Sequence, residues 1–298
     1  MSRGIFILLV LLLVQVALGF SLERKAWLMT DDEAVHRLFA VEPSVIDDIL
    51  ITDDQGNETV LLRVGQTWTL PELEDLPADP ERIQGVLEAI TRGETGWHVA
   101  DTVAARQRFQ VAAYHFRRRV IMVGDGELLG TVYLGTSPGF RRVHARNDTG
   151  NEIYALRLNA FDVPASSEPW LDRRLLQIRA PLQIVADGYT LQRADDRWLS
   201  DGGLEPDARE VAALLQALRT LQVQGLADED MQRDLASLQP ELVLDVTGLS
   251  GSSRLEFFSS SGSYYVYSGE FALFFELSGF EYDRLTSMDA RLLQGAMP

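Results

Sequence analysis

Residues that could carry out catalysis or bind a metal ion are few in this chain of 298 residues. The histidines are His36, His98, His115 and His144. They are far apart in sequence, and none belongs to the His-Glu-x-x-His pattern that binds zinc on one face of a helix. The chain has no cysteine, which excludes disulfides, thiolate nucleophiles and iron–sulfur clusters, and Lys25 is its only lysine. We therefore expect no catalytic residue, no metal site, no cofactor and no enzymatic activity.

Three further patterns could suggest chemistry, but each is typical of a turn or a strand edge. Adjacent carboxylates such as Asp53 and Asp54 point to opposite faces of a strand, so they are poor metal ligands. The Gly-Asp-Gly segment at 124–126 is not followed by the helix pattern that a dinucleotide fingerprint requires. The serines between residues 250 and 263 lack the Gly-x-Ser-x-Gly pattern of a hydrolase nucleophile.

A group of arginines is the first feature that suggests an interaction surface. The formal net charge of the chain is −17, and an acidic surface repels phosphate backbones, so nucleic acid is not an expected partner. Against this background, six arginines are close in sequence: Arg117, Arg118, Arg119, Arg141, Arg142 and Arg146. They are a candidate surface for lipid head groups or for an acidic partner. The alternative is a solvated strand face whose arginines pair with neighbouring acids.

A run of aromatic residues is the second candidate surface. Its members are Tyr264, Tyr265, Tyr267, Phe271, Phe274 and Phe275. Alternate residues of a strand face opposite ways, which could leave some of the rings exposed, and tyrosine and phenylalanine are enriched in interfaces. Packing of the rings into the core from an edge strand is the interpretation we favour.

Two equivalent helices are expected to help position these residues. The first begins at Asp79, an N-cap followed by Pro80 at the first helical position. The second begins at Asp207, with Glu210 three residues further on as in a capping box. The offset is 207 − 79 = 128, and it also relates the apolar positions of the two helices. These positions are Ile83, Val86, Leu87 and Ile90 in the first helix and Val211, Leu214, Leu215 and Leu218 in the second.

Strand patterns surround each helix in the same order. A hairpin with a tryptophan, Trp68 or Trp198, precedes each helix, two hairpins follow, and a similar phrase closes each copy, at 171–176 and 288–293. The sequence therefore predicts an α+β fold of two tandem repeats. Each repeat has a β-hairpin, a helix and a mainly antiparallel sheet. We expect the repeat units to be residues 43–180 and 181–298.

The N-terminus resembles a targeting signal. Residues 4–20 are apolar apart from Gln15, and a helix of this length spans about 25 Å, near the lower limit for crossing a bilayer. We favour an uncleaved hydrophobic helix over residues 1–22, followed by a juxtamembrane spacer helix over 23–42. The charges on the two sides of the segment nearly balance and do not set its orientation; the family resemblance given below implies that the body lies on the periplasmic side of the inner membrane. The alternative is a signal peptide cut before Phe20, which would release the body into the periplasm.

The same residues carry a resemblance to a known family. They are Trp68, Asp79-Pro80, the first helix stripe, Gly130 to Gly135, Ile153-Tyr154, Asp172 to Leu176, Trp198, Pro206-Asp207 and Leu235 to Pro240. The chain resembles domain-of-unknown-function family 4340 (DUF4340) over most of residues 45–298. The first repeat lacks the family's Phe-Gly-Leu-x-x-Pro phrase around Phe109 to Tyr114. The resemblance implies a bacterial envelope protein, usually encoded beside an ABC transport system of the gliding-motility type.

Three functions are compatible with these observations. The one we favour is a non-enzymatic accessory or scaffold component of an ABC-type transport system, whose partners are the membrane and a transporter permease or other envelope proteins. The alternative is a periplasmic ligand- or glycan-binding module that uses the cleft between the repeats. A third is a hydrolase whose carboxylates are brought together only by folding.

Overall fold

The computed structural model describes residues 37–39, 41–93, 95, 98–139, 141–249 and 251–295. The expected hydrophobic helix and most of the expected spacer helix lie outside these residues. The part of the spacer that is described, residues 37–39, 41 and 42, contains no helix. Among the described residues, no helix combines the length and the hydropathy that crossing a bilayer requires.

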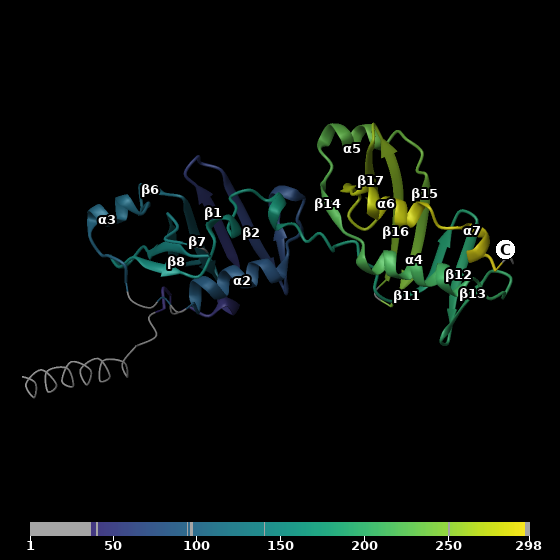
Figure 1. The fold of residues 1–298 in the computed structure, drawn as a ribbon, viewed down its shortest axis with the longest axis horizontal. Coiled ribbons are helices and arrows are strands. Elements are labelled where there is room, and N and C mark those ends of the chain that lie inside the picture. Colours follow the sequence, from purple (N-terminus) through teal and green to yellow (C-terminus); the bar gives the residue numbers. More distant parts are fainter. Residues whose placement is uncertain are drawn as a thin grey trace, which may run out of the picture. The chain divides into compact units, whose positions relative to one another are not determined.

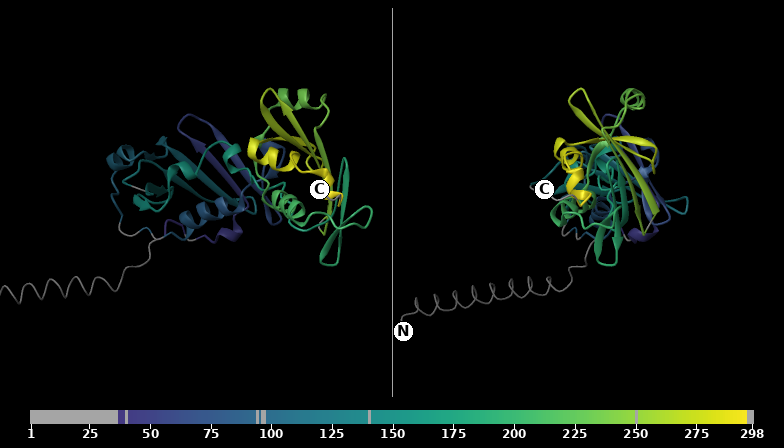
Figure 2. Two further views of the ribbon diagram at one scale, coloured as in Figure 1. Left: turned by 45° about the vertical axis from the view of Figure 1, so that its right-hand side comes forward. Right: turned by 90° about the vertical axis from the view of Figure 1, so that its right-hand side faces the viewer.

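The structure is a mixed α and β fold with two large antiparallel sheets and, in the described part of the chain, six α-helices (Figures 1 and 2). Its residues form two compact units that interleave in sequence, one with residues up to 57 and 84–163, the other with 58–83 and 164–298. In the second of these, residues 164–178 lie against 58–83. The hydroxyls of Thr59 and Ser167 are 2.7 Å apart, and Ala78 and Leu171 form a β-bridge.

The first sheet has the strand order β10-β9-β8-β7-β1-β2-β3-β4. Its strands are β1 (Asp48–Asp53), β2 (Glu58–Val64), β3 (Thr67–Leu70), β4 (Leu76–Pro77), β7 (Arg118–Gly124), β8 (Glu127–Leu134), β9 (Val143–Asn147) and β10 (Tyr154–Leu156). The other elements are α2 (Pro80–Thr91), α3 (Val103–Arg108) and a separate hairpin of β5 (Val111–Ala112) and β6 (His115–Phe116). Ile83, Val86, Leu87 and Ile90 of α2 are all buried, which confirms the predicted apolar stripe.

The second sheet has the strand order β13-β12-β11-β15-β16-β17-β18-β14. Its strands are β11 (Pro181–Ala186), β12 (Tyr189–Ala194), β13 (Arg197–Ser200), β14 (Val223–Leu226), β15 (Leu242–Gly248), β16 (Gly251–Ser260), β17 (Ser263–Ser268) and β18 (Leu273–Leu277). Its helices are α4 (Ala208–Thr220), α5 (Glu229–Leu235), α6 (Gly279–Thr286) and α7 (Ala290–Leu293). Phe257 and Phe258 are adjacent in β16 and face opposite ways. Phe257 meets Tyr282 of α6, and Phe258 packs with Leu235 of α5, so helices cover both faces.

The two sheets share one order of seven strands. In this correspondence β10-β9-β8-β7-β1-β2-β3 matches β18-β17-β16-β15-β11-β12-β13, and α2 and α4 follow β4 and β13 in the chain. The sequence predicted two strands before each helix. The structure has four before α2 and three before α4, because the turns at residues 54–57 and 187–188 join strands on both sides and the short β4 follows β3. The predicted helix starts are confirmed. Asp79 and Asp207 accept hydrogen bonds from backbone amides of the first turns of α2 and α4.

The closing phrase of each copy docks on the helix of the same copy. The backbone amide of Asp79 donates to the Trp170 carbonyl oxygen at 2.7 Å, and the amide of Asp207 donates to the Leu292 carbonyl oxygen at 3.0 Å. In the first copy, Arg174 adds ion pairs to Glu81, Asp172 and Asp79 at 2.9, 3.0 and 3.2 Å. The hydrogen bond to Glu81, followed by those to the other carboxylates, raises the pKa of Arg174 above its ordinary value.

We expect Arg174→Ala to lower the free energy of unfolding by about 1 to 2 kcal/mol. This exceeds the effect of an isolated surface pair because one guanidinium, 30% exposed, serves three carboxylates. The control is Arg291→Ala, since Arg291 has the equivalent place in the second closing phrase and is exposed. Urea unfolding of both variants tests the prediction, and equal losses in the two would contradict it.

Candidate anion-binding face

The run of three arginines before and in β7 is divided between the two faces of the first sheet. Arg118 and Arg119 are successive strand residues, so their side chains point to opposite faces. Arg118 Nε donates to the Val163 carbonyl oxygen at 2.9 Å, and Arg119 Nη2 donates to Thr52 Oγ1 at 3.2 Å. Arg117 precedes the strand, and its Nε donates to Gln110 Oε1 at 2.7 Å. The sequence did not predict this division.

Arg146 lies on the same face as Arg119. The strand register pairs Arg119 with Tyr133 and Tyr133 with Arg146, and directly paired residues share a face. Arg146 is only 5% exposed, and its guanidinium donates to the carbonyl oxygens of Val111, Asn147 and Gly150 at 2.6 to 2.9 Å. Burial, followed by the charge of Arg106, lowers the pKa of Arg146. An arginine nevertheless stays cationic at neutral pH, so this is a buried positive charge.

Aromatic rings separate the guanidinium groups on this face. The Arg119 guanidinium lies 5.5 Å from the Phe116 ring, the Phe116 and Tyr133 rings are 5.8 Å apart, and the Arg146 guanidinium lies 4.8 Å from the Tyr133 ring. Cations over ring faces are attracted by the ring quadrupole, which holds positive charges in place without a carboxylate. The β5–β6 hairpin contributes Phe116, and the sheet contributes the other three residues.

Helix α3 adds two arginines that the sequence analysis missed. Thr102 caps α3 by accepting a hydrogen bond from the Ala105 amide, and Arg106 and Arg108 lie in the last turn. The Arg108 guanidinium lies 4.4 Å from the Phe109 ring, which in turn stacks on His144 at 4.1 Å. One sequence signal could have identified them. Residues 102–124 contain five arginines and no aspartate or glutamate, in a chain of net charge −17.

His144 is held in its neutral form beneath this surface. Its side chain is buried, and Nδ1 forms a hydrogen bond with Thr136 Oγ1 at 2.9 Å. Burial, together with the charge of Arg108, lowers the pKa of His144, against the opposing effect of a hydrogen bond to the Thr136 backbone. At neutral pH the imidazole therefore packs on Phe109 as an uncharged ring.

We define the arginine face as Arg106, Arg108, Arg117, Arg119 and Arg146. In the described part of the chain, none of these five forms an ion pair with a carboxylate. The buried Nε atoms of Arg106 and Arg119 also have no hydrogen-bond partner among the described residues. Among the described residues, the charges of the face are thus not paired directly with carboxylates, although Asp148 is close enough to raise the pKa of Arg146, and such a surface attracts anions.

The remaining predicted arginines lie apart from the face as defined. Arg118 occupies the opposite side of the sheet, as described above. Arg141 and Arg142 lie in the connection between β8 and β9, and both are exposed. Ser137 Oγ donates to the Arg142 carbonyl oxygen at 2.7 Å and so fixes the turn.

The three tyrosines of the predicted aromatic surface pack mainly against other rings. Tyr265 is only 4% exposed and belongs to the core beside α5. Tyr267 packs on Phe274 with ring centroids 4.9 Å apart, and Tyr264 packs on Tyr282 at 4.5 Å. The structure therefore uses these rings in packing, which is the interpretation that we favour from the sequence.

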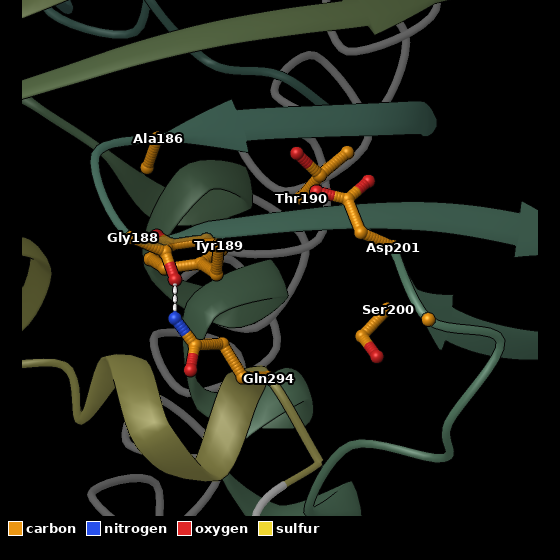
Figure 3. Close-up of a pocket in the computed structure, with 8 residues that line it drawn as sticks. Ala186, Gly188, Tyr189, Thr190, Ser200, Asp201 and Gln294 are labelled. Atoms are coloured by element: carbon orange, nitrogen blue, oxygen red, sulfur yellow. Dashed lines mark hydrogen bonds between the residues drawn. The ribbon is translucent and has the colours of Figure 1, made fainter.

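A polar depression of about 390 Å³ lies beside the β11–β12 turn and α7 (Figure 3). It is lined by Ala186, Gly188, Tyr189, Thr190, Ser200, Asp201, Gly202 and Gln294. Gln294 Nε2 donates to the Gly188 carbonyl oxygen, which ties α7 to the turn. Burial raises the pKa of Tyr189 to about 12, and its buried hydroxyl has no hydrogen-bond partner among the described residues. In the same described part, no group of three potential ligand side chains could hold a metal ion.

We expect Tyr189→Phe to leave the free energy of unfolding at neutral pH unchanged or to raise it by up to about 1 kcal/mol, because it removes an unbonded buried hydroxyl. The pKa of Tyr189 is higher in the folded protein than the value of about 10 in an unfolded chain. The stability that arises from this difference in pKa is therefore fully present below pH 10. It is lost as the pH rises toward 12, because the unfolded chain then ionises Tyr189 more readily than the folded protein does. The phenylalanine variant should lack this part of the alkaline loss. Urea unfolding at neutral and alkaline pH measures both effects, and a clear loss of stability at neutral pH would show that the hydroxyl is bonded.

Comparison with known proteins identifies a family. The family model described as "Domain of unknown function (DUF4340)" matches residues 68–240, from the tryptophan of β3 to the residues just before β15. No curated protein and no solved structure matches the chain. Because the family model covers more than half of the sequence, the chain belongs to the DUF4340 family.

Proposed function

We propose that this protein acts by binding, as a non-enzymatic accessory or scaffold component of an ABC-type transport system in the bacterial envelope. The observation that carries the proposal is the arginine face, where five guanidinium groups have no carboxylate partner among the described residues. A surface of this kind provides attraction and orientation for an anionic partner. Two of its arginines, Arg119 and Arg146, belong to strands of the first sheet, which is a more rigid support than a loop.

The proposal places the chain at a membrane. The apolar segment of residues 4–20 is the basis for a single-pass anchor, with the body on the periplasmic side of the inner membrane. The association with a transport system is what resemblance to the family implies. The shared strand order of the two sheets supports a body made of two copies of one module, which could serve a scaffold as two separate contact surfaces.

Co-purification from native membranes tests this function. The tagged full-length protein is extracted in mild detergent, and the proteins recovered with it are identified and quantified. We expect a transporter permease in a stoichiometric amount. Recovery of the protein alone in a soluble, shortened form would contradict anchoring, and turnover of an envelope component by the purified protein would contradict a non-enzymatic role.

A matched pair of double variants connects the test to the arginine face. Arg108→Gln with Arg117→Gln removes two exposed positive charges from the face. Arg209→Gln with Arg219→Gln removes the same charge from exposed positions of α4. If the face binds the partner, the first pair reduces recovery of the permease and the second pair does not.

A second candidate function is the binding of a soluble ligand, such as a glycan. The observation that favours it is the depression beside α7, whose lining includes the hydroxyls of Thr190 and Ser200 and the carboxylate of Asp201 (Figure 3). A thermal-shift screen against envelope glycans tests it. A ligand that stabilises the protein but not an Asp201→Asn variant would support this function, and a flat screen would count against it.

A further inference from the structure

The segment that builds most of the arginine face is basic without interruption. Between residues 102 and 124 all charged side chains are arginines, apart from the titratable His115. Arg108 and Arg117 are exposed, and Arg106 and Arg119 are partly exposed. A protein face with this density of arginines is suited to a partner surface that carries many anionic groups. The negative potential of such a surface attracts each arginine of the face.

Exposed apolar side chains accompany the arginines. Tyr114, at the tip of the β5–β6 hairpin, is 74% exposed, and Val103, at the start of α3, is 65% exposed. A tyrosine beside arginines is typical of membrane–water interfaces, where the ring lies at the level of the head groups. An acidic protein would also be attracted by the arginines and the exposed tyrosine. What favours a lipid surface is the closeness of the same face to the apolar segment of the chain.

The chain enters the described body next to the same face. Asn147 Nδ2 donates to the Leu38 carbonyl oxygen at 3.0 Å, and Arg146 Nη1 donates to the Asn147 carbonyl oxygen at 2.6 Å. Only residues 21–37 lie between the apolar segment and Leu38, and seventeen residues of any conformation reach at most about 60 Å. A face held within that distance of a bilayer meets it at a high effective concentration.

We propose that the arginine face docks on anionic lipid head groups of the membrane in which residues 4–20 are anchored. This inference rests on the anchoring in the proposed function and goes beyond it by naming the partner of the face. The phosphate groups of the lipids accept hydrogen bonds from the exposed guanidinium groups of Arg108 and Arg117, while Tyr114 and Val103 enter the interfacial region. The docked face would fix the orientation of the body relative to the bilayer.

Hydrogen–deuterium exchange of the full-length protein in lipid nanodiscs tests the proposal. One set of nanodiscs contains phosphatidylcholine alone, and the other contains about 30% phosphatidylglycerol. We expect amides of residues 103–117 to exchange about threefold or more slowly in the anionic discs, because docking restricts opening of α3 and the hairpin. Adding about 0.5 M NaCl should remove the difference, since salt screens contacts of exposed charges.

The two double variants defined above serve again as test and control. Arg108→Gln with Arg117→Gln should lose the lipid-dependent protection, and Arg209→Gln with Arg219→Gln should keep it. Equal exchange in both kinds of disc would overturn the proposal. So would protection by an added polyglutamate peptide but not by phosphatidylglycerol, which would assign the face to an acidic protein. The nanodisc assay contains no transporter. A failure to recover a permease in the co-purification therefore does not change the result expected in the nanodiscs. Failure of the protein to enter nanodiscs would instead overturn the anchoring on which both proposals rest.

Discussion

A Gly135→Ala substitution is expected to lower the free energy of unfolding by about 3 kcal/mol and to loosen α3 from the first sheet. Gly135 follows β8, and a Cβ at this position would lie 1.9 Å from the Phe109 carbonyl oxygen and 2.5 Å from that of Gln110. Both obstacles are backbone atoms, so no side-chain rotation relieves the overlap. The Thr136 amide donates to the same Phe109 oxygen at 2.9 Å, so this link between α3 and the sheet would be strained or lost.

The substitution also tests the support of the arginine face. Because Arg106 and Arg108 are placed by α3, we expect faster hydrogen exchange in residues 103–109 and loss of the lipid-dependent protection. Gly139→Ala is the control, since a Cβ there meets no atom within 4 Å, and its effect should stay within about 0.5 kcal/mol. Urea unfolding and hydrogen exchange measure the two effects. A Gly135→Ala variant as stable as Gly139→Ala would contradict this account of the junction.

Trp170→Ala is expected to cost about 3 to 5 kcal/mol, the range for removing a fully buried large aromatic side chain. Trp170 ends a short 3-10 helix (Glu168–Trp170) and is 1% exposed. Its Nε1 donates to the Pro164 carbonyl oxygen at 3.0 Å, and the Arg82 guanidinium lies 4.9 Å from the ring. The variant would therefore lose apolar contacts, a cation–π contact and the partner of a carbonyl oxygen together.

Two further variants separate these contributions. Trp170→Phe keeps most of the ring but removes the indole N–H, so we expect a loss of about 1 to 2 kcal/mol. Trp198→Ala should cost less than Trp170→Ala, because Trp198 of β13 is only partly buried. Thermal and urea unfolding of the three variants gives the order. Equal losses for the two alanine variants would show that burial does not set the cost.

The two copies differ most in the element that covers the end of each sheet. Helix α3 precedes β7 in the first copy, and α5 precedes β15 in the second. The exposed residues of α5 include Glu229, Asp230 and Asp234, whereas α3 has arginines and no acid. Beneath α5 the contacts are Phe258, Tyr265 and Phe274, and among the described residues of the second copy no charged side chain is buried as Arg146 is. The basic surface is thus specific to the first copy, although the strand order is shared.

Local signals in the sequence were sufficient for much of the fold. The stripes of α2 and α4, their aspartate caps and the two-residue turns at 125–126 and 187–188 depend on residues close together in the chain. The internal offset of 128 residues then related the two copies without any knowledge of their contacts. Helix α3 was not predicted, because six residues are too few to show a periodicity.

The arginine face, by contrast, was decided by the tertiary structure. The sequence placed Arg117, Arg118 and Arg119 in one cluster, but the pleat of β7 sends Arg118 to the other side of the sheet. Pairing of β7, β8 and β9 aligned Arg119 with Arg146 across Tyr133, and the packing of α3 added Arg106 and Arg108. The sequence by itself determined the positions of α2 and α4 and of most hairpin strands, and that the chain is acidic with a basic segment. Only the tertiary structure decided which arginines share a face and which of them have no carboxylate partner among the described residues. The physical reason is that strand register and ion pairing both depend on contacts between residues far apart in the chain.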